Sequence, residues 1–294
     1  MNLLLNLGPL KAGGGETVGI NFINNLDNNG YYNKIFLLVS KGSQLELLSQ
    51  KLNLSHYSVS NNPIIRVLTE IFIIPFVIRA NNINIIYTLF GFGFFPTLIP
   101  QVIGSADSNI YFPEIDFWKD YNTIQRIKKK CIDKIRIFGI KRASGVIFEN
   151  KSMLERGTKL YKIKESLFIL PSISNYDQNS SKYNESRSIN LLFLCGWQKN
   201  KNYHLIPDLL KQSKVYNLNI HIFFTAKEDN SIEHLSFIEK IKEENLENLI
   251  TMTGYLNKDQ LSNVYNKTDY VILLSQLESF SNNIIESWYF KRVL

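Results

Sequence analysis

Short, strongly apolar runs alternate with longer helix-like segments along the whole of this 294-residue chain. The runs are rich in Ile, Leu, Val and Phe, as is typical of strands buried on both faces of a sheet. Helical segments between such strands predict β-α-β units and therefore parallel sheets. The expected strands are 2–7, 34–40, 83–89, 101–106, 145–150, 166–170, 189–196, 219–225, 249–254 and 270–275. The expected helices are 16–26, 43–51, 63–80, 151–158, 203–214, 231–245, 257–266 and 282–290, with 63–80 mostly buried.

A polar, turn-rich stretch divides this alternation into two halves. The segment 171–188 has almost no apolar periodicity, which is typical of a linker. We therefore predict an α/β chain with an N-terminal Rossmann-like domain at 1–170, a linker at 171–188 and a second Rossmann-like domain at 189–294. Ligands of such folds bind beyond the carboxyl ends of the strands, so we expect a ligand cleft between two facing domains.

Composition indicates a reducing compartment and argues against a secreted, a zinc-binding and a membrane-spanning protein. Cys131 and Cys195 show no spacing typical of a zinc site, and they fit two reduced thiols in a cytoplasmic protein. The first residues lack the basic region of a secretory signal. The uncharged stretch 80–106 contains Pro, Gly and Asn residues that would leave backbone groups unsatisfied in lipid, so no transmembrane helix is predicted.

Positive charge is concentrated in one segment. Between Lys119 and Arg142 there are nine basic and two acidic residues, a surplus equal to the net charge of +7 of the whole chain. Apolar residues recur there at three- and four-residue steps, as on one face of a helix. Such a basic amphipathic helix suits an anionic membrane surface. A solvated surface helix packed on the core and a nucleic-acid patch are the alternatives, and we predict no nucleic-acid partner.

Two glutamates flank the start of the last predicted helix. Glu278 follows the strand 270–275, and Glu286 lies within the helix 282–290, which Ser281 or Asn282 would cap. Backbone N–H groups at a helix start can bind a diphosphate, and a carboxylate can accept two hydrogen bonds from a ribose diol. The segment could therefore hold a nucleoside diphosphate sugar. A helix whose early Glu merely favours its dipole is the structural alternative.

The segment 254–287 resembles the signature region of family-4 glycosyltransferases of the GT-B fold. The residues that carry the resemblance are Gly254, Tyr255, Leu256, Thr268, Asp269, Ser275, Glu278, Ser279, Phe280 and Glu286. Gly196, Lys201 and Asn202 extend it, since the family places a basic residue there that faces the donor diphosphate. In the first half, the glycine loop with Gly14 and Gly15 resembles the loop with which the family approaches phosphates or acceptor. Asp107 resembles the family's acceptor-side position, although a loop carboxylate or a helix cap is the alternative.

The sequence departs from the family pattern at three places. Trp197 stands where the family commonly has Arg, so Lys199 or Lys201 would supply that phosphate contact. Ser281 replaces a frequent Gly and can still cap the helix. The family continues past the segment 291–294, which looks like the beginning of another strand, so a C-terminal truncation is expected.

The resemblance implies a retaining glycosyltransferase that moves a sugar from a nucleoside diphosphate sugar to a glycan or lipid-linked acceptor in surface polysaccharide or lipopolysaccharide assembly. Glu278 and Asp107 would be catalytic. The donor would be bound by Gly14, Gly15, Gly196, Lys201, Tyr255, Leu256, Phe280, Ser281, Asn282 and Glu286. Lys201 and the N–H groups near Ser281 would stabilise the leaving diphosphate, so we expect neither a metal nor a cofactor. The protein would lie at the inner membrane face. A nucleotide-sugar epimerase of similar fold and an inactive remnant are the alternatives.

Overall fold

The computed structural model describes residues 1–294 except 12, 27–30, 96 and 171–187. The chain divides into two compact units, Met1–Ser174 and Asn175–Leu294, each built around its own parallel sheet. The predicted linker at 171–188 falls almost entirely outside the described residues. The α/β fold class, with two Rossmann-like halves, is confirmed.

The first unit contains a seven-stranded parallel sheet in the order β3-β2-β1-β4-β5-β6-β7. Its strands are β1 (Asn2–Asn6), β2 (Lys34–Ser40), β3 (His56–Val59), β4 (Ile85–Leu89), β5 (Gln101–Ser105), β6 (Gly145–Phe148) and β7 (Ser166–Phe168). The strand order reverses direction between β1 and β4. Such a reversal opens a crevice at the carboxyl ends of the two strands, where ligands bind in open α/β sheets.

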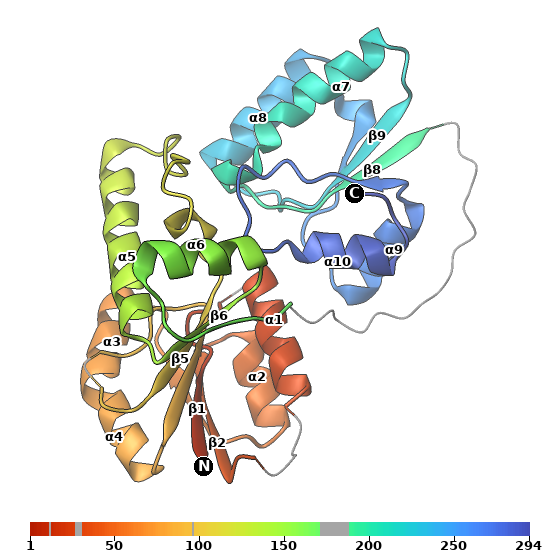
Figure 1. Ribbon diagram of the computed structural model, residues 1–294. Coiled ribbons are helices and arrows are strands. Elements are labelled where there is room, and N and C mark those ends of the chain that lie inside the picture. Colours follow the sequence, from red (N-terminus) through yellow and green to blue (C-terminus); the bar gives the residue numbers. More distant parts are fainter. Residues whose placement is uncertain (12, 27–30, 96, 171–187) are drawn as a thin grey trace. The chain divides into compact units, whose positions relative to one another are not determined.

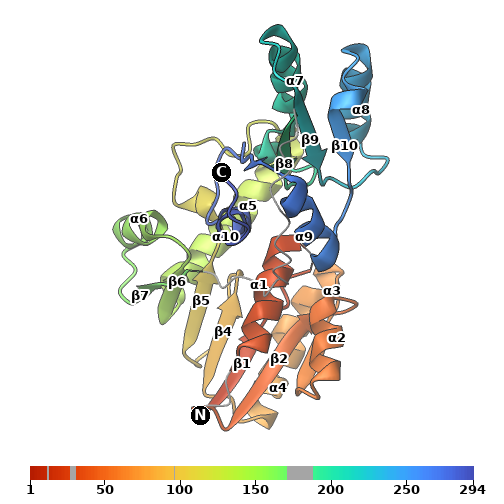
Figure 2. The same cartoon turned by 90° about the vertical axis from the view of Figure 1, so that its right-hand side faces the viewer.

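Helices cover both faces of this sheet. They are α1 (Gly13–Asn24), α2 (Gln44–Lys51), α3 (Pro63–Leu68), the π-helical turn η1 (Thr69–Ile73), α4 (Ile74–Ala80), the 3-10 turn η2 (Ser108–Ile110), α5 (Thr123–Arg142) and α6 (Lys151–Tyr161). Helices α1 and α2 lie on one face, and α3, α4 and α5 lie on the other (Figures 1 and 2). Side chains from both layers pack on strands whose central residues, such as Leu4, Leu38 and Ile86, are fully buried.

The second unit contains a four-stranded parallel sheet in the order β10-β9-β8-β11. Its strands are β8 (Ile189–Phe193), β9 (Ile220–Phe224), β10 (Ile250–Met252) and β11 (Tyr270–Val271). The helical elements are η3 (Lys199–Lys201), η4 (Tyr203–Leu205), α7 (Ile206–Val215), α8 (Ile232–Glu243), η5 (Glu247–Leu249), α9 (Lys258–Lys267) and α10 (Asn282–Tyr289). Helices α7 and α8 cover one face, and α9 and α10 cover the other (Figure 1).

Most predicted elements are present, and two predictions are corrected. The helical stretch 63–80 forms, but it is mostly exposed, and only Thr69 and Ile74 are buried in it. The strand expected at 270–275 ends at Val271, because the chain then leaves the sheet as an irregular loop. β3 was not predicted, since its short run has weak apolar content. Beyond α10, Val293 pairs with Tyr270 in a parallel bridge, as expected for the start of another strand.

None of the helices in the described part of the chain combines the length and the apolar character needed to cross a membrane.

Candidate functional site

Hydrogen bonds tie together the two loops that follow β8 and β11 in the second unit. The Asn202 side chain donates to the carbonyl of Leu274 at 2.8 Å, and the Gln276 backbone N–H donates to the carbonyl of Asn200 at 2.8 Å. Asn202 takes the left-handed conformation, with φ of 53°, that lets η3 and η4 meet at this point. The two loops therefore form one unit at the carboxyl edge of the sheet, where ligands bind in such folds.

This junction brings Lys201 and Glu278 together. The ammonium of Lys201 forms an ion pair with the Glu278 carboxylate, and their side chains are only 22% and 24% exposed. The sequence predicted both residues for the site but not their contact, because they lie 77 residues apart. A half-buried ammonium beside a loop that lines a ligand edge can exchange its carboxylate partner for an anionic ligand.

The start of α10 lies next to the same loops. The Asn283 side chain donates to the carbonyl of Leu194, directly after β8, at 3.1 Å. Ser281 occupies the N-cap position and is buried, as predicted, but its side chain makes no capping hydrogen bond. The predicted N-cap position is therefore confirmed, although the hydroxyl makes no hydrogen bond with the first turn of α10.

Glu286 is buried one turn into α10. Its carboxylate accepts a hydrogen bond of 3.1 Å from the hydroxyl of Tyr265 on α9, and its exposed fraction is 9%. The Tyr265 ring stacks on Phe290 with 4.4 Å between ring centroids. Charged groups are rarely buried without partners, so this carboxylate is held in a fixed position. The fixed position is what recognition of a ribose diol requires.

The other predicted donor residues of this unit lie along the same sequence segments. Tyr255 is largely exposed after Gly254, whose φ is +66°, and Leu256 is half-buried. Phe280 and Asn282 flank Ser281, and Gly196 lies in the loop after β8. Donor binding by these residues remains a prediction from the sequence.

Ser275 adds a signal that the sequence did not single out as a binding residue. Its hydroxyl is buried and, within the described ranges, has no hydrogen-bond partner. Buried polar groups in native proteins nearly always have partners. This hydroxyl lies between Leu274 and Gln276, in the loop that carries Glu278.

In the first unit, the predicted glycine loop is part of a helix. Gly14 and Gly15 belong to the first turn of α1, which begins at Gly13 rather than at Glu16. Glu16 is buried and accepts a hydrogen bond of 2.8 Å from the Gln44 backbone N–H. The prediction of the helix start is wrong because glycine lowers helix propensity without excluding a first turn. The first turn still leaves Gly14 exposed.

Asp107 follows β5 and forms an ion pair of 3.0 Å with Arg136 of α5. Arg136 also contacts Asp133, which in turn accepts hydrogen bonds from Asn109 and Trp118. Asp107 stands at the N-cap position of η2 without a capping hydrogen bond, so the helix-cap alternative is wrong. Burial raises the pKa of the Asp107 carboxyl, Arg136 lowers it and the nearby Asp133 raises it again.

The raised pKa of Asp107 predicts a measurable dependence of stability on pH. Between the unfolded and the folded pKa the folded chain holds more protons, so the free energy of unfolding falls as pH rises through this window. Asp107→Asn cannot ionise and escapes this loss. We expect the melting temperature of the variant, relative to the parent, to increase as the pH rises above the ordinary range of an aspartate carboxyl. Paired thermal melts test this, and a difference that shrinks with pH would contradict it.

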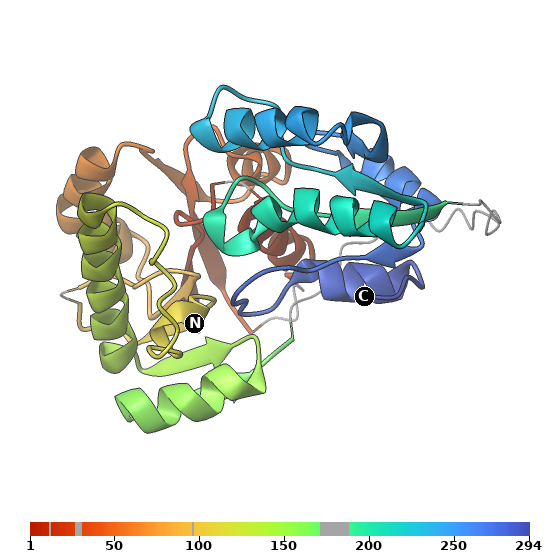
Figure 3. The ribbon, with the colours of Figure 1, turned by 90° about the horizontal axis from the view of Figure 1, so that it is seen from above.

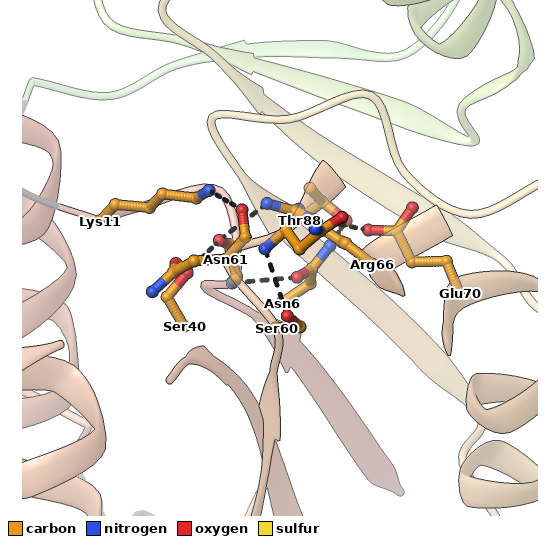
Figure 4. Close-up of polar contacts among 10 residues, drawn as sticks. Asn6, Lys11, Ser40, Ser60, Asn61, Arg66, Glu70 and Thr88 are labelled. Atoms are coloured by element: carbon orange, nitrogen blue, oxygen red, sulfur yellow. Dashed lines mark hydrogen bonds and ion pairs between the residues drawn. The ribbon is translucent and has the colours of Figure 1, made fainter. Parts of the chain in front are cut away.

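A second polar cluster occupies the carboxyl edge of the seven-stranded sheet, at the crevice between β1 and β4 (Figure 4). The Asn6 side chain donates to the hydroxyl of Thr88 at 3.3 Å. The carbonyl of Gly8 accepts hydrogen bonds from Ser40 at 2.9 Å and from Arg66 at 3.0 Å. The cluster fixes the loop between β1 and α1. Sequence reasoning missed it, although polar residues at the ends of three apolar strands were the available signal.

No group of three or more His, Cys, Asp or Glu side chains is placed to hold a metal ion within the residues that the structure describes.

Comparison with known proteins agrees with the architecture. Residues 175–292 match the family described as "Glycosyl transferases group 1". No curated protein sequence matches the chain. Among solved structures, the chain is similar to Anabaena Alr3699/HepE in complex with UDP and glucose, with a TM-score of 0.66 and 16% identity. The match covers 99% of this chain and 79% of that one.

Two further structures show the same fold. A glycosyltransferase from Rickettsia africae matches with a TM-score of 0.68 and 18% identity, over 99% of this chain and 77% of that chain. The lipopolysaccharide outer core galactosyltransferase WaaB matches with a TM-score of 0.63 and 10% identity, over 99% and 79%. The fold is therefore that of GT-B glycosyltransferases. The match of residues 175–292 to this family, on a chain with the GT-B fold, identifies the protein as a transferase.

Proposed function

We propose that the protein transfers a sugar from a nucleoside diphosphate sugar to a hydroxyl group of a glycan or lipid-linked acceptor. The observation that carries this proposal is the Lys201–Glu278 ion pair at the carboxyl edge of the second sheet. The pair supplies one cation and one carboxylate at this edge, which supports binding of a diphosphate and its sugar there. The similar structure in complex with UDP and glucose supports a nucleotide sugar as the donor.

Lys201 would neutralise charge on the leaving diphosphate, together with N–H groups of the first turn of α10. Preorganised positive groups of this kind stabilise the charge that develops in the transition state and need no reorganisation during reaction. We therefore propose a transfer that is independent of metal and of cofactor. Retention of the anomeric configuration, and membership of family 4, are proposed on the resemblance of segment 254–287.

We further propose a role in surface polysaccharide or lipopolysaccharide assembly, at the inner face of a membrane. The similarity of fold to WaaB supports this role. The basic segment 119–142 supports contact with an anionic surface, because α5 leaves Lys128, Lys130 and Lys134 exposed. Part of the apolar face of this helix, at Ile137 and Ile140, packs on the core of the first unit, whereas Ile124 and Ile127 are exposed.

A transfer assay tests the proposal. Purified protein is incubated with UDP, GDP and CMP sugars, with and without a saccharide acceptor, and the released nucleotide is measured. We expect release with one class of donor, dependence on acceptor, and an unchanged rate when EDTA is added. Interconversion of the sugar without an acceptor would instead identify an epimerase, and nuclear magnetic resonance of the product would show whether the configuration is retained.

A further inference from the structure

The helical stretch α3–η1–α4 turns Arg66 and Glu70 inward and leaves most of its large apolar side chains exposed, while Ile74 packs in the core. Arg66 pairs with Glu70 at 2.8 Å, both side chains are about 15% exposed, and Arg66 also donates to the Gly8 carbonyl (Figure 4). The large apolar side chains that are exposed in this stretch are Ile64, Ile65, Val67, Leu68, Ile71, Phe72, Ile73 and Phe76. This polarity is the reverse of that of an ordinary surface helix.

The exposed apolar residues form one stripe. Ile64, Leu68, Phe72 and Phe76 recur every fourth residue, which places them on the same side of the helical stretch. Ile64 is 71% exposed, Phe72 is 61% and Phe76 is 74%. Large contiguous apolar patches are rare on monomeric soluble proteins and mark interaction sites. The stripe is therefore a candidate interaction surface of the first unit.

Helix α5 lies on the same face of the sheet as α3 and α4, as both the front view and the view from above show (Figures 1 and 3). Its cationic side chains Lys128, Lys130 and Lys134 are exposed. Ile124 and Ile127 are exposed beside them. The apolar stripe therefore shares a face of the sheet with the segment that carries the whole net positive charge of the chain.

We propose that the outward face of α3, η1 and α4 docks on an anionic lipid bilayer, with α5 supplying the attracting charge. Apolar side chains that enter the interface and basic side chains that meet anionic headgroups are the two features of an interfacial helix. A two-fold contact with a second copy would place the same patch against itself. It would bring α5 close to its own copy, and such like-charge contacts are unfavourable.

The docking surface begins at the functional edge of the sheet. α3 follows the carboxyl end of β3, and Arg66 binds the loop that leads to Gly14 and Gly15. A bilayer on this face would present headgroups next to the proposed acceptor side. This inference rests on the proposed function and deepens it: the acceptor is a saccharide linked to a membrane lipid, reached from the bilayer surface.

Vesicle sedimentation tests the surface. The parent chain is expected to pellet with vesicles of phosphatidylglycerol and phosphatidylcholine, and not with phosphatidylcholine alone. Phe72→Ser with Phe76→Ser should lower partitioning by about tenfold, because two large apolar side chains no longer enter the interface. Lys128→Glu with Lys130→Glu should lower it as well, and more strongly at low than at high salt.

The matched control is Leu47→Ser with Leu52→Ser on α2, which removes two exposed apolar side chains from the opposite face of the sheet. Its partitioning should stay within about twofold of the parent. Equal pelleting of the Phe72/Phe76 variant and the parent would overturn the proposal. A parent that is dimeric in light scattering, becomes monomeric in that variant and ignores vesicles would overturn it too. Calorimetric binding of nucleotide by the same variants reports separately on the transferase proposal.

Discussion

Lys201→Met is expected to reduce kcat by about 10²–10³, whereas Lys199→Met should change it by less than about threefold. Lys201 forms the half-buried pair with Glu278, and its ammonium is the cation that would meet the leaving diphosphate. Methionine keeps the length of the side chain and removes only the charge. Lys199 lies two residues earlier and lines a different cavity of about 300 Å³, with Phe237 of α8.

Lys201→Arg tests whether the positive charge of the side chain is what the reaction requires. The arginine keeps a positive charge and should restore part of the rate, while its planar group fits the diphosphate differently. Steady-state kinetics with a saturating acceptor measure all three variants. Loss of activity in Lys199→Met with little effect in Lys201→Met would show that the other lysine of this loop contacts the phosphates.

Glu286→Gln is expected to raise KM for the donor by about tenfold to a hundredfold, with little change in kcat. Hydrogen bonds to a charged group contribute roughly 1.5–3 kcal/mol, and the ribose that they would bind does not change during the reaction. Glutamine keeps the shape of the side chain and can still accept a hydrogen bond from Tyr265, which lies 3.1 Å from the carboxylate. The fold should therefore survive the substitution.

Two further variants help to interpret the result for Glu286→Gln. Tyr265→Phe removes the hydroxyl that holds the carboxylate, and we expect a smaller rise in donor KM, because Glu286 keeps its charge. Glu239→Gln, an exposed glutamate on α8, serves as the control without effect. An unchanged donor KM in Glu286→Gln, together with an unchanged melting temperature, would remove Glu286 from the donor site.

Periodicity predicted the fold because buried parallel strands have a strong local signature. β2 and β8 consist mostly of apolar residues, and helices such as α8 and α9 begin at clear caps, Ser231 and Asn257. β3 was missed because a four-residue edge strand buries few side chains. The stretch 63–80 was predicted to be mostly buried but is mostly exposed. Apolar content alone does not distinguish a core helix from an exposed interaction surface.

The sequence predicted which residues belong to the candidate site but did not predict which of them contact one another. Lys201 and Glu278 belong to loops that tertiary structure brings together, and no local pattern encodes that meeting. Asp107 was predicted without its partner Arg136, for the same reason. The Arg66–Glu70 pair had a signal in the sequence, since two opposite charges four residues apart in an apolar segment must either pair or face water.

Calorimetric titration of the folded parent chain with UDP, GDP and CMP tests the central claim most directly. We expect one nucleoside diphosphate to bind to a single site, and Lys201→Met to weaken this binding while Lys199→Met does not. If none of the three nucleotides binds to a chain whose circular dichroism shows the α/β fold, the carboxyl edge of the second sheet is not a donor site.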